Sequence, residues 1–171
     1  MKDNVILIGM PSCGKSTIGV VLAKALGYRF VDSDLVIQEK TGLLLSEIID
    51  SKGLDSFNQI ENEINATLDC HKSVISTGGS VIYGKEAMEH LASIGTVVYL
   101  ELPYEELCER IGDLTARGVS IRVGQTFRDL YEERCPLYEK YADVTVHTDR
   151  LSIREVVQLL KEELLQGIPR E

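Results

Sequence analysis

The chain of 171 residues carries a net charge of −9, and 44% of its residues are hydrophobic and 26% charged. This length suits one domain with a sizeable core, so we predict a single domain over residues 1–171. The negative charge argues against a nucleic-acid surface, which needs a basic face. No apolar run reaches membrane-spanning length. Because the first residues lead directly into a predicted strand, we expect no signal peptide. We therefore expect a cytoplasmic protein. We also expect it to be a monomer.

The first predicted element is a strand at residues 5–8, followed by a glycine loop and a helix. The strand is apolar and β-branched, as buried strands are. Residues 9–17 fit the pattern G-x-x-x-x-G-K-S/T at every fixed position, and the apolar residues after them recur at helical intervals. Backbone N–H groups of such a loop and the helix N-terminus bind polyphosphates. The predicted nucleoside triphosphate site consists of Pro11, Ser12, Cys13, Gly14, Lys15, Ser16 and Thr17.

Two side chains of this loop suit a phosphate site with a metal ion. Lys15 can reach the β- and γ-phosphates as a point charge. Ser16 can place its hydroxyl on the Mg²⁺ that bridges these phosphates. We therefore predict that the chain binds a nucleoside triphosphate together with Mg²⁺.

The rest of the chain alternates strands with helices. Further strands are predicted at residues 28–31, 73–77, 96–102 and 144–146. Helices are predicted at residues 35–39, 46–51, 55–68, 85–94, 104–111, 126–142 and 152–165. We expect the helix at 126–142 to be interrupted near Pro136. This alternation predicts an α/β fold in three layers, with a parallel sheet of about five strands and helices on both faces.

Polar residues follow the first three predicted strands. Asp32 and Asp34 end the second strand, and Gly78-Gly79 follow the third. In a parallel sheet these positions and the glycine loop meet in one crevice beyond the carboxyl ends of the strands. One carboxylate can serve the Mg²⁺ ion, and the other can orient an acceptor hydroxyl or take its proton. Asp34 also suits the N-cap of the next helix.

Residues 112–125 break the alternation of strands and helices. The segment is rich in glycine and arginine and has no clean period, which is typical of a mobile lid over a phosphate site but also of a disordered surface loop. Arg117 and Arg122 lie in this segment, and Arg134 lies in the helix after it. An arginine on a closing lid can stabilise charge on a transferring phosphoryl group.

These segments together resemble the shikimate kinase family over nearly the whole chain. The matching segments are residues 9–17, Asp32-Ser33-Asp34, residues 53–61, Thr77-Gly78-Gly79, Arg117, and Arg134 with Pro136-Leu137-Tyr138. The resemblance implies the nucleoside-monophosphate-kinase-like fold and a role in aromatic amino acid biosynthesis. It implies that ATP, with Mg²⁺, donates its γ-phosphate to the 3-hydroxyl of shikimate.

The resemblance also implies roles for individual residues. Lys15, Asp34 and Arg117 would be catalytic, with Asp34 as the base and Arg117 also at the ATP site. Ser16 and Asp32 would serve the metal ion. The acceptor would be bound by Asp34, Asn58, Gly78, Gly79 and Arg134.

Three departures from the family pattern lie on the acceptor side. Asn58 stands where the family has an arginine that grips the shikimate carboxylate, and Ser80 replaces the third glycine of a triple glycine. The lid reads Arg117-Gly118-Val119-Ser120 where the family has R-P-L-L. An amide cannot form the two-pronged charged pair of an arginine.

These departures leave two kinase hypotheses. The chain phosphorylates shikimate with another cation on the carboxylate, such as Arg122 or Lys85, or it phosphorylates a different small hydroxylated acceptor. A third hypothesis is a nucleotide-binding regulator without catalysis, which the retained Lys15, Ser16 and aspartates disfavour.

Overall fold

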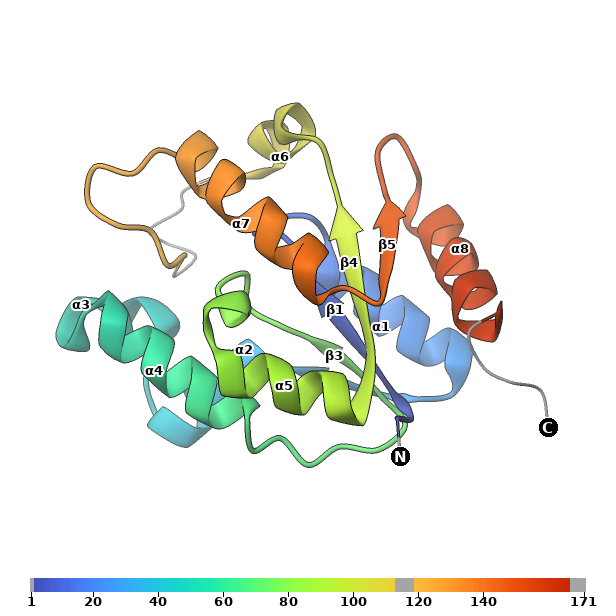
Figure 1. Ribbon diagram of the computed structural model, residues 1–171, viewed down its shortest axis with the longest axis horizontal. Helices are drawn as coiled ribbons and strands as arrows, with labels where there is room; N and C mark the ends of the chain where they lie inside the picture. The colour runs from blue at the N-terminus through green and yellow to red at the C-terminus, as the bar shows by residue number, and fades with distance from the viewer. Residues whose placement is uncertain (1, 113–118, 167–171) are drawn as a thin grey trace.

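A five-stranded parallel sheet forms the centre of the computed structural model, which describes residues 2–112 and 119–166. The strands run in the order β2-β3-β1-β4-β5 (Figure 1). They are β1 (Asn4–Ile8), β2 (Arg29–Asp32), β3 (Ser73–Ser76), β4 (Gly95–Glu101) and β5 (Val144–His147). Every neighbouring pair is parallel, so all carboxyl ends lie at one edge of the sheet. The predicted fold class is confirmed.

Helices cover both faces of this sheet. They are α1 (Lys15–Leu26), α2 (Ser33–Thr41), α3 (Leu45–Lys52), α4 (Leu54–Asn65), α5 (Lys85–Ile94), α6 (Tyr104–Arg110), α7 (Phe127–Tyr141), α8 (Ile153–Gln166) and the 3₁₀ turn η1 (Val81–Tyr83). In Figure 1, α5 and α7 cross in front of the strands and α1 passes behind them. Helices α2, α3 and α4 form a separate group that contacts α5 and η1.

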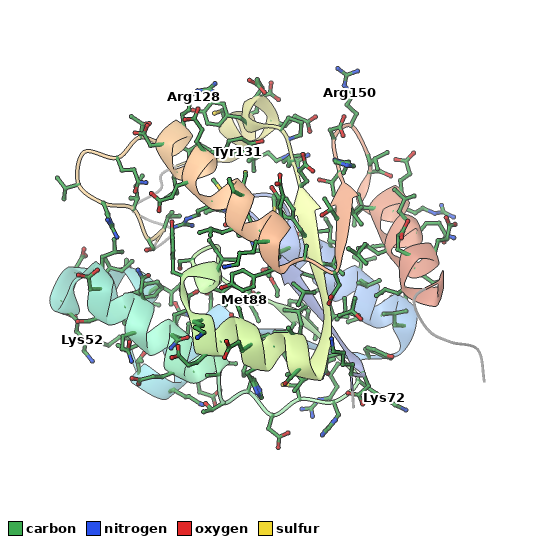
Figure 2. The ribbon with its side chains drawn as sticks, viewed as in Figure 1. Lys52, Lys72, Met88, Arg128, Tyr131 and Arg150 are labelled. Carbon is green, nitrogen blue, oxygen red and sulfur yellow. The ribbon has the colours of Figure 1, made fainter. Side chains whose placement is uncertain are left out.

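The main core lies around the central strand. The apolar residues 5–8 of β1 are all buried because helices cover both faces of the sheet. Figure 2 shows Met88 of α5 in the interior, whereas Lys52, Lys72 and Arg150 lie at the edges of the molecule. None of the helices in the described part of the chain has the length and apolar character that a membrane crossing requires.

A second, smaller core holds α2, α3 and α4 together. Its buried members include Ile37, Ile48, Phe57 and Ile64. Phe57 and Ile64 lie on the inner face of α4, and Glu61, one turn from each, shares that face. Packing of this core therefore decides how α4 presents Glu61 to the rest of the molecule.

Two sequence predictions about helix boundaries are wrong. Helix α7 runs through Pro136 without interruption, because Leu130, Arg134 and Tyr138 are buried on both sides of the proline and hold the two halves in line. The cap of α2 is Asp32 and not Asp34: the helix begins at Ser33, and the Asp32 carboxylate accepts a hydrogen bond from the Asp34 N–H over 3.0 Å. The extended backbone of Asp32 suits a capping residue.

Candidate active site

A cavity of about 820 Å³ opens at the carboxyl ends of the strands. Its walls come from the loop after β1, the first turn of α2, helix α4, the turn after β3, helix α7 and the segment after β5. Its size falls in the range of small-molecule sites. The predicted convergence of the first three strand ends on one crevice is therefore present in the structure.

The loop after β1 occupies the floor of this cavity. Lys15 is 8% exposed, and its Nζ donates hydrogen bonds to the carbonyl oxygens of Gly9 (2.8 Å) and Met10 (2.9 Å). Gly14 precedes α1 with φ of 102°, a conformation that side chains disfavour. Ser12 also has a positive φ of 67°. Left-handed residues of this kind curl a loop into an anion-binding concavity before a helix N-terminus.

Oxygen atoms suited to Mg²⁺ meet beside this loop. The Ser16 hydroxyl donates to Asp32 Oδ2 over 2.8 Å, and its Oγ lies 3.1 Å from the Ser76 hydroxyl. Mg²⁺ prefers such oxygen ligands and takes only one or two from protein when phosphates supply others. The described residues contain no cluster of three or more histidine, cysteine, aspartate or glutamate side chains that could hold a metal ion. Ser16 and Asp32 thus fit a magnesium ion.

The buried carboxylate of Glu61 and the half-buried carboxylate of Asp34 flank Gly78 in the cavity wall. A Cβ at Gly78 would lie 2.5 Å from Glu61 Oε1 and 2.8 Å from Asp34 Oδ1, so only glycine leaves room for both. Burial and, less strongly, the charge of Asp32 raise the pKa of Asp34 to about 6. Burial raises the pKa of Glu61 to about 7, against the lowering effects of the Ser80 hydrogen bond, Arg134 and Lys15.

A buried arginine closes the back of the acceptor side. Arg134 is 1% exposed, and its guanidinium donates to the Ser120 carbonyl and, over 3.3 Å, to the Tyr83 hydroxyl. Its Nη1 lies 3.0 Å from the point where a Cβ of Gly79 would stand. The Tyr138 hydroxyl donates to the Gly79 carbonyl over 2.6 Å. Helix α7 therefore positions both Arg134 and the backbone of the turn at Gly78-Gly79, called the glycine turn below.

Most predicted site residues line this cavity. They are Pro11, Ser12, Cys13, Gly14, Lys15, Ser16, Thr17, Asp34, Gly78, Gly79 and Arg134. Asp32 lies behind Ser16, to which it is hydrogen-bonded. Arg117 lies outside the described residues, as do all of residues 113–118 of the predicted lid; Val119 and Ser120 of that segment line the cavity.

Asn58, which was also predicted to bind the acceptor, does not line the main cavity. Its Oδ1 accepts a hydrogen bond from the Ser120 hydroxyl over 3.1 Å, and it lines a separate cavity of about 240 Å³ next to Tyr83 and Lys85. The amide therefore joins α4 to the segment before α7.

Sequence reasoning missed Glu61 and Tyr138 as individual site residues. Glu61 stands at the last position of the family segment 53–61, which was a usable signal. The part of the cavity formed by Arg110, Thr148 and residues 151–153 was also missed, because nothing in that sequence separates it from an ordinary strand-to-helix connection.

Comparison with known proteins finds relatives of one family. The sequence model of the shikimate kinase family matches residues 11–165. The chain is 36% identical to a shikimate kinase of Thiobacillus denitrificans over 97% of this chain and 93% of that protein. It is 39% identical to a shikimate kinase of Mycobacterium avium over 96% and 94% of the two chains. The solved structure of a shikimate kinase from Acinetobacter baumannii, in complex with shikimate, superposes with a TM-score of 0.83 at 28% identity, covering 99% of this chain and 97% of that one.

Proposed function

The chain belongs to the shikimate kinase family and is an ATP-dependent small-molecule kinase, and we propose that it transfers the γ-phosphate of ATP to the 3-hydroxyl of shikimate. The observation that carries this proposal is that one cavity is lined both by the phosphate-binding loop and by Asp34. The A. baumannii relative, which has the same fold, is in complex with shikimate. Phosphoryl transfer depends mainly on positioning and charge stabilisation, which such a cavity can supply.

At the ATP end, Lys15 is proposed to hold the phosphates. Its ammonium group now binds the Gly9 and Met10 carbonyls, which keeps it within the loop where a polyphosphate would lie. Ser16 and Asp32 are proposed to hold Mg²⁺, which when bound compensates the charge of the phosphates. Arg117 is proposed to add positive charge to the transferring group.

At the acceptor end, Asp34 is proposed to orient the hydroxyl and accept its proton. Its Oδ1 is buried and has no hydrogen-bond partner among the described residues, so it is available to a hydroxyl donor. Gly79 presents its backbone at the same wall, where Tyr138 holds it. Arg134 is the buried cation nearest this turn and is proposed to bind the shikimate carboxylate.

A second candidate is a different hydroxylated acceptor that lacks a carboxylate. The observation that favours it is the place of Asn58, which is uncharged and bonded to Ser120 where the family has a carboxylate-binding arginine. In that case the reaction and the ATP end are unchanged, and only the group opposite Arg134 differs.

The test measures ADP release from ATP and Mg²⁺ with shikimate, without acceptor, and with a panel of polyols, sugars and hydroxy acids. Efficient saturable turnover of shikimate supports the first proposal. Weak turnover of shikimate beside strong turnover of another acceptor supports the second candidate instead. Lys15→Met should reduce turnover by about 10²–10³-fold in either case. Lys24→Met, at an exposed position of the same helix, is the matched control and should have no effect.

A further inference from the structure

We propose that Glu61, held by Ser80, is a second acceptor-binding carboxylate, which together with Asp34 binds two neighbouring hydroxyl groups of the acceptor. This inference rests on the proposed function, because it concerns the acceptor end of the same cavity. It makes Glu61 a specificity-determining residue and Ser80 its positioning residue. Ser80 stands at the third glycine position of the family pattern, so the arrangement is a property of this chain.

The side chain of Glu61 is anchored in the wall of the main cavity. Its side chain projects from the inner face of α4, is 1% exposed and lines the main cavity. The Ser80 hydroxyl donates to Glu61 Oε2 over 2.5 Å from the turn after β3. A hydrogen bond to one carboxylate oxygen fixes the direction of the other. Ser80 is itself buried, so this bond is shielded from competition with solvent.

One carboxylate oxygen of Glu61 and one of Asp34 remain without hydrogen-bond partners among the described residues. Glu61 Oε1 and Asp34 Oδ1 are both buried, and neither has a hydrogen-bond partner in the described part of the chain. Both approach the same point beside Gly78, at 2.5 Å and 2.8 Å from a Cβ placed there. Buried acceptor oxygens are normally satisfied. A ligand with O–H groups on neighbouring carbon atoms would satisfy both at once.

The wall at Gly78 suits hydroxyl groups of a ligand and disfavours a carboxylate. A carboxylate placed at this point would meet two acceptor oxygens and be repelled when they are ionised. Arg134, the buried cation on this side of the cavity, donates to the Ser120 carbonyl and the Tyr83 hydroxyl. Glu61 and Asp34 therefore form a hydroxyl-binding wall at Gly78, and Arg134 lies beside the adjacent Gly79.

Ser80 also affects the charge of Glu61. The groups that act on this carboxyl are Asp34, which raises its pKa, and Ser80, Arg134 and Lys15, which lower it. Loss of the Ser80 hydroxyl removes one of the lowering contributions. Ser80→Ala should therefore move the pH dependence of the acceptor KM to higher pH.

The experiment compares shikimate with 4-deoxyshikimate, which lacks the hydroxyl next to the 3-hydroxyl. KM and kcat are measured for the unmodified enzyme, Glu61→Gln and Ser80→Ala. Removal of the hydroxyl should raise KM of the unmodified enzyme by about 10- to 100-fold, the value of a hydrogen bond to a charged group. In Glu61→Gln that ratio should shrink to about twofold. Glu63→Gln, an exchange at a solvent-facing position of the same helix, should leave the ratio unchanged.

Several results would overturn the inference. If Glu61→Gln raises KM equally for both compounds, the residue has only a structural role and the inference fails while the proposed function stands. If shikimate is not phosphorylated, the same comparison is made with a cyclic polyol from the acceptor panel and its deoxy analogue; a reduced ratio in Glu61→Gln then supports the inference although the proposed function has failed. If no acceptor with neighbouring hydroxyls is phosphorylated, both fail. Should Glu61→Gln not fold, an unshifted pH profile in Ser80→Ala would overturn the inference.

Discussion

Ser16 donates its hydroxyl hydrogen bond to Asp32 over 2.8 Å, which joins the first turn of α1 to the end of β2. The other oxygen of Asp32 caps α2 by accepting from the Asp34 N–H. Asp32 thus has two separable functions, one at the proposed magnesium site and one in the local structure that places Asp34.

Asp32→Asn should separate these functions. Asparagine caps helices about as well as aspartate, so the free energy of unfolding should change by less than about 0.5 kcal/mol. The lost charge should raise the Mg²⁺ concentration for half-maximal turnover by about tenfold or more. Asp32→Ala should lose the cap as well, at about 1 kcal/mol. Magnesium titrations and urea unfolding measure both effects, and Asp69→Asn at an exposed position is the control. Equal magnesium requirements in all variants would exclude Asp32 from the metal site.

Tyr138→Phe should loosen the glycine turn without removing the aromatic ring. Tyr138 donates to the Gly79 carbonyl over 2.6 Å, and its ring stacks on Tyr99 with centroids 5.1 Å apart. Phenylalanine keeps the stacking and loses the hydrogen bond, which should cost about 1 kcal/mol in unfolding free energy. Because Gly79 lies at the acceptor wall, the acceptor KM should rise by about three- to tenfold while the KM for ATP stays unchanged. Tyr141→Phe, on the same helix, is the control. A rise in both KM values would indicate a general loss of structure.

Asn58→Arg tests whether the acceptor pocket is otherwise of the family type. Arginine would lose the bond to Ser120 but would lie one turn from Glu61 on α4, near the acceptor wall. If shikimate is the acceptor, a charge-assisted contact with its carboxylate should lower KM by about tenfold. Gln59→Arg adds the same charge at the adjacent exposed position and should have no such effect. No gain in Asn58→Arg would mean that the pocket around residue 58 has been rebuilt.

Glu61→Gln should change how stability depends on pH. The pKa of Glu61 is about 7 in the folded state and 4.5 is the ordinary value, so between these values the folded state binds the extra proton. Stability from this group is complete at low pH and is lost as pH rises through about 7. Between about pH 5 and pH 8 the unmodified protein should lose up to about 3 kcal/mol relative to Glu61→Gln. Unfolding curves of both proteins at these pH values measure the difference. A constant difference would mean that Glu61 has an ordinary pKa.

Contiguous sequence determined the ATP end of the site. The apolar run of β1, the glycine at a positive φ before α1, and Lys15 with Ser16 all lie within residues 4–16, and each follows from local geometry. Helix α5 has the bounds that periodicity predicts. The α/β class likewise follows from the alternation of elements along the chain.

The acceptor end was decided by the tertiary structure. Ser80 and Glu61 are 19 residues apart, and Tyr138 and Gly79 are 59 apart. Helical periodicity shows which face of α4 or α7 is inward, but it does not show which buried polar groups meet across such separations. Arg134 illustrates the reason: in the sequence it is one of several helical arginines, and only packing of α7 against η1 and β4 makes it a buried cation. The same packing carries α7 through Pro136, because burial on both sides of the proline outweighs the one backbone hydrogen bond that the ring removes.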